Sequence, residues 1–286
     1  MKKLKLKVNF DVCTFCNHQC NFCSNPDNRT IKSQVNIEQY SKVMDNISKY
    51  IEIEELGLSA KGEVLINKDL ANIIKISKEK YNIKYLYISS NGALFVKEKI
   101  DELLSAGLDS TKFSINAVTK ETYKKIHNQD DFDIVIENLK YLIEAKKIKF
   151  INHKIFISSV TTIDKNLLEK KFEELLGKEN MQYINDIFVF KLDYTSKFEE
   201  TKSNEIITKG CPIPFNEVYI NSDCSLGFCC KDYFDEINFG SLLNNDFLDL
   251  YHCKQYEDIR KMHIKKEFPN NHLCKNCLLY KKENDV

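Results

Sequence analysis

The eleven cysteines of this 286-residue chain are confined to two regions, and this distribution constrains the fold more than any other feature. Four of them lie near the N-terminus, at Cys13, Cys16, Cys20 and Cys23. The other seven lie between positions 211 and 277, and the 187 residues between the two groups contain none. An odd number of cysteines in so long a chain does not suit a disulfide framework. Clustered cysteines in a reducing compartment indicate metal, so we expect one metal-bearing domain followed by a second metal-bearing segment.

Composition and charge place the chain among soluble globular proteins. Apolar residues make up 43% and charged residues 29%, which is ordinary for a folded domain. Basic and acidic residues both number 42, so the formal net charge is zero and gives no electrostatic reason to expect nucleic acid or an anionic membrane as a partner. The sequence has no apolar stretch of the roughly 18 residues that span a bilayer, and its start lacks a secretory signal. We therefore expect a cytoplasmic protein.

Strand-like and helix-like segments alternate between the two cysteine groups. Periodicity predicts strands over residues 4–10, 53–58, 85–89, 112–117, 155–160 and 187–192. It predicts helices over residues 37–47, 70–80, 96–106, 132–145 and 167–176. About six βα units imply a parallel sheet, because parallel neighbours need a crossover helix. Periodicity alone leaves an incomplete barrel and a doubly wound sheet open, but in both the functional loops lie at the carboxyl edge of the strands.

The alternation of expected strands and helices ends at about residue 195. Residues 218–220 and 226–228 read as a short hairpin, which is followed by a helix near 247–261 and a cysteine-bearing tail. We therefore divide the chain at that point, into residues 1–195 and 196–286.

The first cysteine group contains the spacing C-x3-C-x2-C, directly after the first expected strand. Three thiolates on a short loop, at Cys16, Cys20 and Cys23, can hold three corners of a cubane cluster and leave the fourth iron open. This loop, with the aromatic Phe22 before its last cysteine, resembles the radical S-adenosylmethionine (SAM) superfamily. The resemblance covers roughly residues 4 to 195 and implies a partial (βα)6 barrel. It also implies that the open iron binds SAM and that electron transfer yields a 5′-deoxyadenosyl radical, which abstracts a substrate hydrogen.

Zinc is the alternative for this loop. With Cys13 the spacing becomes C-x2-C-x3-C-x2-C, and four thiolates could bind zinc. Three residues between the two pairs is shorter than common zinc modules use, so an iron–sulfur cluster is the better interpretation. We expect Cys13 to be a nearby free thiol and His18 to be a loop residue.

Three further segments agree in order with the same superfamily. Gly62-Glu63 follows the second strand and is similar to the family's Gly-Gly-Glu-Pro-type segment, with Lys61 in place of the first glycine. Asn91-Gly92 follows the third strand, and the fourth ends in a Ser-x-Asn segment in which Asn116 replaces the frequent aspartate. The resemblance implies that SAM is contacted by Phe22, Gly62, Glu63, Asn91, Gly92, Ser114 and Asn116.

The second cysteine group resembles the SPASM/twitch extension of radical SAM enzymes. It implies a small β-hairpin plus helix domain with one auxiliary [4Fe–4S] cluster, for which we expect the ligands Cys211, Cys229, Cys274 and Cys277. Adjacent residues in a strand point to opposite sides, so Cys229 and Cys230 do not both ligate one cluster, and we favour Cys229. Cys224 is expected in a turn and Cys253 as a buried thiol. A zinc site is the alternative here too.

A fully ligated second cluster suits a reaction that removes an electron after hydrogen abstraction. We therefore expect an oxidoreductase that oxidises an alcohol of a sugar or aminocyclitol-type small molecule. Asp232 is the candidate general base, because family members carry an acid near this position. A flavodoxin- or ferredoxin-type protein is the expected electron donor.

Two other functions remain open at this stage. One is a peptide- or protein-modifying radical SAM enzyme that performs Ser/Cys oxidation, epimerisation or crosslinking. The cysteine loop begins at residue 13, which leaves no room for an N-terminal leader-peptide domain and so favours a small substrate. The other, of a different class, is a non-catalytic iron–sulfur or zinc binding module.

Overall fold

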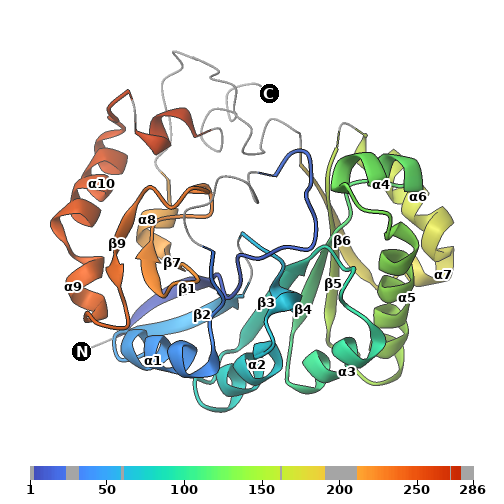
Figure 1. Ribbon diagram of the computed structural model, residues 1–286, viewed down its shortest axis with the longest axis horizontal. Coiled ribbons are helices and arrows are strands. Elements are labelled where there is room, and N and C mark those ends of the chain that lie inside the picture. Colours follow the sequence, from blue (N-terminus) through green and yellow to red (C-terminus); the bar gives the residue numbers. More distant parts are fainter. Residues whose placement is uncertain are drawn as a thin grey trace.

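The strands of this protein form one nine-stranded sheet in the order β6-β5-β4-β3-β2-β1-β7-β8-β9 (Figure 1). The structure is a computed structural model that describes residues 3–23, 32–58, 61–161, 163–190, 211–270 and 272–277. The expected domain boundary at residue 195 lies outside the described residues, so the division there stays a prediction. None of the helices in the described ranges is long and apolar enough to cross a membrane.

Six parallel strands build the first part of the sheet. They are β1 (Leu4–Phe10), β2 (Ile51–Gly57), β3 (Tyr85–Ser90), β4 (Ser110–Ser114), β5 (Lys154–Val160) and β6 (Ile184–Phe190). Each strand pairs in parallel with the next one along the chain. Because sequence neighbours are also sheet neighbours, all crossovers run in the same direction and put their helices on one face. This is the winding of an open, partial barrel, and it confirms the expected α/β fold.

The helices wrap the outer face of the curved sheet in Figure 1. They are α1 (Ile37–Ile47), α2 (Leu70–Glu79), α3 (Lys97–Ser105), α4 (Lys120–His127), α5 (Phe132–Ile148), α6 (Lys165–Leu176) and the short α7 (Lys178–Met181), with the 3₁₀ turn η1 (Val64–Ile66) after β2. Helix α1 begins with a capping box, because Asn36 accepts from the Gln39 amide while the Gln39 side chain accepts from the Asn36 amide. Its apolar face is buried against the sheet, where Phe10 and Tyr40 stack at 5.3 Å.

Helix α4 was not predicted from the sequence, and two predicted segments differ from the structure for a local reason. The fourth strand, expected over 112–117, ends at Ser114 because the Asn116 side chain takes over from the backbone and accepts from the Val160 amide at 2.7 Å. The single helix expected near 247–261 is two helices, α9 (Phe247–Tyr251) and α10 (Lys254–Lys265). Cys253 is extended and forms the N-cap of α10, which interrupts the helical run.

The C-terminal hairpin extends the barrel sheet rather than forming a layer of its own. It consists of β7 (Glu217–Ile220) and β8 (Ser225–Gly227), followed by β9 (Asn238–Ser241), with α8 (Ile213–Asn216) before it and η3 (Leu273–Asn276) at the end of the described chain. Strand β7 pairs in parallel with β1, and β8 and β9 follow antiparallel. As expected, Cys224 lies in the turn between β7 and β8, with a left-handed φ of 65°.

A buried ion pair joins the two parts of the chain. Lys61, in the loop after β2, contacts Asp235, in the loop before β9, and the two side chains are only 4% and 1% exposed. The Lys61 ammonium also donates to the Asn221 side-chain oxygen at 3.2 Å. Removing one member of a buried pair leaves the other charge without compensation in a medium of low polarity. The loop after β2 is therefore fixed to the C-terminal strands by charge as well as by packing.

We predict that Lys61→Met lowers the free energy of unfolding by about 3–5 kcal/mol, because it leaves the Asp235 carboxylate buried without its cation. Urea unfolding of the metal-free protein measures this loss, and the double variant Lys61→Met/Asp235→Asn should recover part of it. Lys5→Met is the matched control, because Lys5 and Glu52 form an exposed pair that contributes about 0–1 kcal/mol. Equal losses in the Lys61 and Lys5 variants would contradict the prediction.

Candidate active site at the carboxyl edge of the sheet

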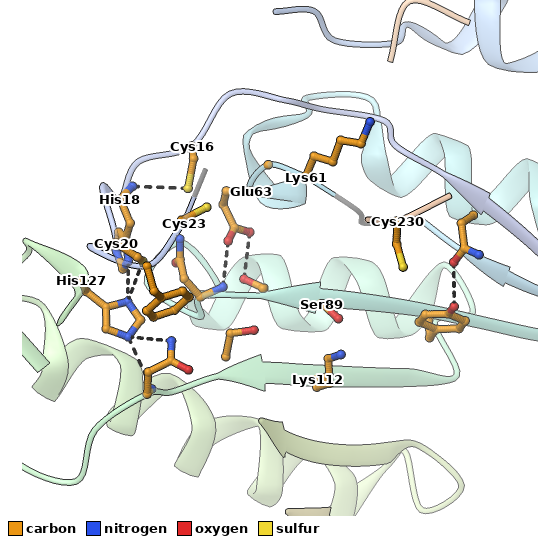
Figure 2. A pocket seen from close by; sticks show the side chains of 18 of the residues that line it. Cys16, His18, Cys20, Cys23, Lys61, Glu63, Ser89, Lys112, His127 and Cys230 are labelled. Atoms are coloured by element: carbon orange, nitrogen blue, oxygen red, sulfur yellow. Dashed lines mark hydrogen bonds between the residues drawn. The ribbon is translucent and has the colours of Figure 1, made fainter. Parts of the chain in front are cut away.

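A cavity of about 470 Å³ opens at the carboxyl ends of the parallel strands, where the fold was expected to carry its functional loops. It is lined from the cysteine loop, from the segments that follow β2, β3 and β4, and from β7 and the residues after β8. This volume is in the range of small-molecule sites. Figure 2 shows that the labelled cysteines of the N-terminal loop lie on one side of the cavity and Cys230 on the other.

The structure brings Cys16, Cys20 and Cys23 to the same cavity wall. Burial, and then neighbouring charges that include Glu63 and Cys23, raises the pKa of the Cys16 thiol to about 12. Burial and the charges of Cys23 and Cys16 raise the pKa of Cys20 to about 12. Neighbouring thiolates repel one another, so several can be ionised at one site only when a cation binds them. An iron–sulfur cluster supplies such cations. The His18 amide donates to the Cys16 sulfur at 3.4 Å, an N–H···S contact of the kind that tunes such clusters.

Cys13 lies apart from these three thiols. It is 2% exposed, does not line the cavity, and pairs through its backbone with Gln34. Its position agrees with the expectation of a nearby free thiol.

Gly62 and Glu63 tie the loop after β2 to the cysteine loop and to β3. A Cβ at Gly62 would collide with the Cys13 carbonyl oxygen and lie 2.7 Å from the Thr14 Cα, so only glycine permits this approach. The Glu63 amide donates to the Phe15 carbonyl at 2.8 Å. Its carboxylate is 2% exposed and accepts from the Ser90 hydroxyl and the Asn91 amide, each at 2.8 Å. Burial nevertheless raises the pKa of the Glu63 carboxyl.

The Asn91-Gly92 segment holds the other side of the cysteine loop. The Asn91 side-chain amide donates to the Asn17 side-chain oxygen at 2.8 Å, and its own oxygen accepts from the Ala93 amide at 3.0 Å. Gly92 has a φ of +84°, and a Cβ there would collide with the Phe113 ring. Asn91 lines the cavity, whereas Gly92 shapes the turn beneath it.

A buried network of two histidines supports Cys20. The His127 imidazole lies 3.1 Å from His18 and 3.5 Å from the Cys20 sulfur, in each case through Nδ1. His18 Nε2 lies 3.0 Å from Asp131, and His127 Nε2 faces the Asn116 side-chain amide at 3.2 Å. One set of protons satisfies all of these contacts: Asn116 donates to Nε2, so Nδ1 of His127 carries the proton toward His18 and Cys20. Burial, and then the neighbouring His18, lowers the pKa of His127 to about 3.

This network explains two features that the sequence left without a physical reason. His18 is 2% exposed and is a fixed element of the loop, with its ring between α4 and the start of α5. Asn116 offers an N–H to His127, which an aspartate could not do in its ionised form. The ligand atoms of His18, Cys20 and His127 all lie within 4.8 Å of one another, so this trio could also hold a metal ion. No sequence pattern indicated His127, because α4 was not predicted as a helix.

The wall of the cavity opposite the cysteine loop is made of polar side chains from β1, β3, β4 and β7. Asn9 bridges two neighbours: it accepts from the Tyr87 hydroxyl at 3.0 Å and donates to Glu217 at 3.1 Å. Tyr219 is 8% exposed and lines the cavity, as Cys230 does. Lys112 points into the cavity from β4 (Figure 2), and burial lowers the pKa of its ammonium group.

The four C-terminal cysteines that the sequence proposed as ligands do not line this cavity. Burial is the largest cause of the raised pKa of both Cys229 and Cys274. The charges of Cys230 and then Cys274 also raise the pKa of the Cys229 thiol, and the charges of Cys277 and Cys211 raise the pKa of Cys274. Cys230, in contrast, lines the cavity. Their assignment as cluster ligands, with Cys229 rather than Cys230, stays a prediction.

Asp232, the candidate base, does not line the cavity. It is 2% exposed, and its two carboxylate oxygens accept from the backbone amides of Glu236 and Ile237, each at 2.9 Å. These contacts hold the loop after β8 and give the carboxylate a structural role. The base role of Asp232 remains untested, and its contacts do not favour it.

We predict that Gly62→Ala destabilises the metal-free protein by about 1–3 kcal/mol, because the added methyl group would collide with backbone that cannot rotate away. Gly57→Ala is the matched control, since the atoms nearest its new methyl group belong to the far end of the Tyr87 side chain rather than to the backbone. Thermal unfolding of both variants measures the difference. A smaller loss for Gly62→Ala than for Gly57→Ala would contradict the role of this close approach.

Comparison with known proteins identifies two regions of the chain. The Radical SAM superfamily matches residues 11–176, which is more than half of the sequence. The SPASM family, described as an iron–sulfur cluster-binding domain, matches residues 211–278. Among curated relatives, a probable GTP 3′,8-cyclase of Saccharolobus islandicus is 33% identical over 133 residues, and the GTP 3′,8-cyclase of Chlorobaculum tepidum is 26% identical over 136 residues. These matches cover 46% and 48% of this chain but only 41% and 40% of the relatives.

Solved structures share the whole fold at low sequence identity. BtrN in complex with AdoMet and 2-DOIA has a TM-score of 0.62 at 16% identity, over 97% of this chain and 94% of BtrN. SuiB of Streptococcus suis, bound to the precursor peptide SuiA, has a TM-score of 0.70 at 16% identity, over 98% of this chain and 71% of SuiB. The enzyme anSMEcpe with AdoMet and a Cp18Cys peptide has a TM-score of 0.68 at 13% identity, over 97% and 87%.

The two family matches confirm the resemblance of both cysteine regions and decide between iron–sulfur and zinc. They imply a [4Fe–4S] cluster that binds SAM and an auxiliary iron–sulfur cluster. The thiols gathered at the N-terminal loop and among the C-terminal cysteines fit these cofactors. The chain therefore belongs to the Radical SAM superfamily and is a radical SAM enzyme with a SPASM domain.

Proposed function

We propose that this enzyme is an oxidoreductase that oxidises an alcohol of a sugar or aminocyclitol-type small molecule. The observation that carries the proposal is the single cavity shared by the N-terminal cysteines and a polar wall from β1, β3, β4 and β7. When bound, SAM and the first cluster would supply a 5′-deoxyadenosyl radical that takes a substrate hydrogen. The auxiliary cluster would accept an electron. The residues of the chain must then bind the substrate, orient one C–H bond and take up a proton.

The polar wall supports a substrate that carries several hydroxyl groups. Asn9, Tyr87 and Tyr219 present amide and phenol groups, which both donate and accept hydrogen bonds. Asn9 and Tyr87 are already held by each other and by Glu217, so these groups are fixed before a ligand arrives. Fixed polar groups of this kind orient a small ligand at low entropic cost.

Lys112 is better placed than Asp232 to accept the hydroxyl proton. Its side chain points into the cavity and has no hydrogen bond or ion pair with any residue in the described ranges. Burial lowers its pKa, which favours the neutral amine that a general base requires. The same group could instead bind an anionic part of the substrate while it is protonated.

A peptide substrate is the second candidate. It is supported by the fold shared with SuiB and anSMEcpe, whose structures contain peptides. The similarity to BtrN, solved with the small molecule 2-DOIA, supports the first candidate in the same way. The partial similarity to GTP 3′,8-cyclases adds GTP as a compound to test.

We predict that a free or nucleotide-linked sugar or an aminocyclitol raises the rate of 5′-deoxyadenosine formation by the anaerobically reconstituted enzyme. The product should be two hydrogens lighter than the substrate, as an alcohol oxidation requires. The measurement is liquid chromatography with mass spectrometry, and the control is the Cys16/Cys20/Cys23→Ala variant. Stimulation by peptides or GTP alone would overturn the proposed substrate class.

We also predict which of two neighbouring cysteines holds the auxiliary cluster. Two cubane clusters contain about eight iron atoms per chain, so Cys229→Ala should lower the iron content toward about four. Cys230→Ala is the matched control and should keep the wild-type iron and sulfide content, because Cys230 lies in the cavity. Loss of iron in the Cys230 variant with retention in the Cys229 variant would reverse the ligand assignment.

A further inference from the structure

His127, in the last turn of α4, is a buried histidine that the oxidation proposed above does not use. It is 1% exposed and lines the cavity beside the cysteine loop. Its ring stacks on Tyr123, one turn earlier in the same helix, at 4.0 Å and 12°, so its orientation is fixed by packing. Nδ1 lies 3.5 Å from the Cys20 sulfur, and Figure 2 shows the ring pointing toward this cysteine.

Two N–H groups of Asn116 face the other ring nitrogen of His127. The Asn116 backbone amide donates to Nε2 at 3.4 Å, and its side-chain amide faces Nε2 at 3.2 Å. The side chain cannot turn its oxygen toward the ring, because that oxygen accepts from the Val160 amide at 2.7 Å. Nε2 is therefore the acceptor, and the proton of neutral His127 lies on Nδ1, toward Cys20.

The contacts of His18 agree with this tautomer of His127. His18 Nε2 lies 3.0 Å from the Asp131 carboxylate, which in its ionised form can only accept. The Nδ1 of His18 is then unprotonated, and it lies 3.1 Å from Nδ1 of His127. The His127 N–H is thus shared between His18 and the Cys20 sulfur. Negative charge on that sulfur strengthens its share of the proton, because hydrogen bonds to charged acceptors are stronger than those to neutral ones.

A metal ion at His18, Cys20 and His127 would require the other tautomer. Their ligand atoms lie within 4.8 Å of one another, but a metal needs a free lone pair on each ligating nitrogen. The two Asn116 amides keep the proton of His127 on Nδ1, where it blocks that lone pair. The contacts therefore favour a hydrogen bond to Cys20 over a metal ion at this place.

We propose that His127 is a positioning residue that donates its Nδ1 proton to a hydrogen bond with the Cys20 thiolate and thereby makes the SAM-binding cluster easier to reduce. Reduction adds negative charge to the cluster and its thiolates, so an N–H donor stabilises the reduced form more than the oxidised form. Asn116 acts through His127, because it fixes the tautomer that carries this proton. The inference concerns the electron that cleaves SAM, so it holds whatever the substrate is.

The first test is a redox titration of the anaerobically reconstituted holoenzyme without SAM, followed by EPR spectroscopy. The signal of the SAM-binding cluster is identified because adding SAM changes it, and the auxiliary cluster serves as an internal reference. His127→Phe keeps an aromatic ring on Tyr123 but has no N–H. We expect the ratio of reduced to oxidised SAM-binding cluster at a fixed potential to fall about tenfold, which is about 59 mV for one electron. The auxiliary cluster should keep its potential.

His127→Asn is the matched variant, because an asparagine amide places an N–H near the position of Nδ1. Its potential should stay closer to the wild type than that of His127→Phe. An unchanged potential in His127→Phe would overturn the proposal. An equal fall in both variants would also overturn it, because the effect would then follow the loss of the imidazole rather than the loss of its N–H.

The second test uses the wild-type holoenzyme alone, so it does not depend on whether a variant assembles its clusters. Histidine labelled with ¹⁵N only in its ring is incorporated, the protein is reduced, and pulsed EPR records the SAM-binding cluster. We expect a coupling between this cluster and a ring ¹⁵N. The His18 backbone amide also donates to the cysteine loop, but it is unlabelled and gives no such signal. Absence of any ring-nitrogen coupling would overturn the proposal.

The proposal also predicts how the rate depends on the reductant. With a weak reductant, His127→Phe should form 5′-deoxyadenosine more slowly than the wild type, because less of its SAM-binding cluster is reduced. A stronger reductant should restore most of that rate. A loss of rate that is the same with both reductants would contradict a role in electron supply.

Discussion

The pairing of β7 with β1 is the constraint on which the cavity depends. The two strands run parallel, with Asn9 opposite Tyr219 and Val8 opposite Val218. Side chains alternate along a strand, so this register sends Asn9 and Tyr219 together to the cavity while both valines are fully buried on the other face. A slip of one residue would exchange the two faces and place valines at the reaction site. The C-terminal strands thus complete a wall that the six barrel strands leave open.

The SAM-binding half of the site is held by contacts between loops rather than by the strands themselves. Glu63 binds the segment after β3, Gly62 lies against the backbone of the cysteine loop, and Asn91 reaches Asn17 inside that loop. Each contact joins two loops at the same sheet edge, so the three thiols are positioned by their neighbours. The Lys61–Asp235 pair extends this chain of contacts to the C-terminal strands. Substitutions in one loop should therefore be felt in the others.

Local patterns predicted the strands and most helices, because burial on one face leaves a period that can be read from the sequence. The cysteine spacing predicted both cluster regions. The alternation argument for Cys229 over Cys230 does not apply, because β8 ends at Gly227 and both cysteines lie beyond it. The pairing of β7 with β1 could not be predicted, because 206 residues separate Phe10 from Glu217 and parallel pairing leaves no turn signal. Contacts such as Lys61 with Asp235 or His127 with Cys20 depend on that three-dimensional proximity, so the printed sequence carries no sign of them.

The neighbouring cysteines after β8 link the two halves of the site through a single peptide. Consecutive Cα atoms are about 3.8 Å apart, so the position of the Cys230 thiol follows closely from that of Cys229. Asp232, which holds the next turn through two backbone amides, limits movement on the other side. If Cys229 is a cluster ligand, as we propose, assembly of the auxiliary cluster also fixes the Cys230 thiol that lines the cavity. The cluster would then help to shape the cavity through the position of Cys230 as well as accept an electron.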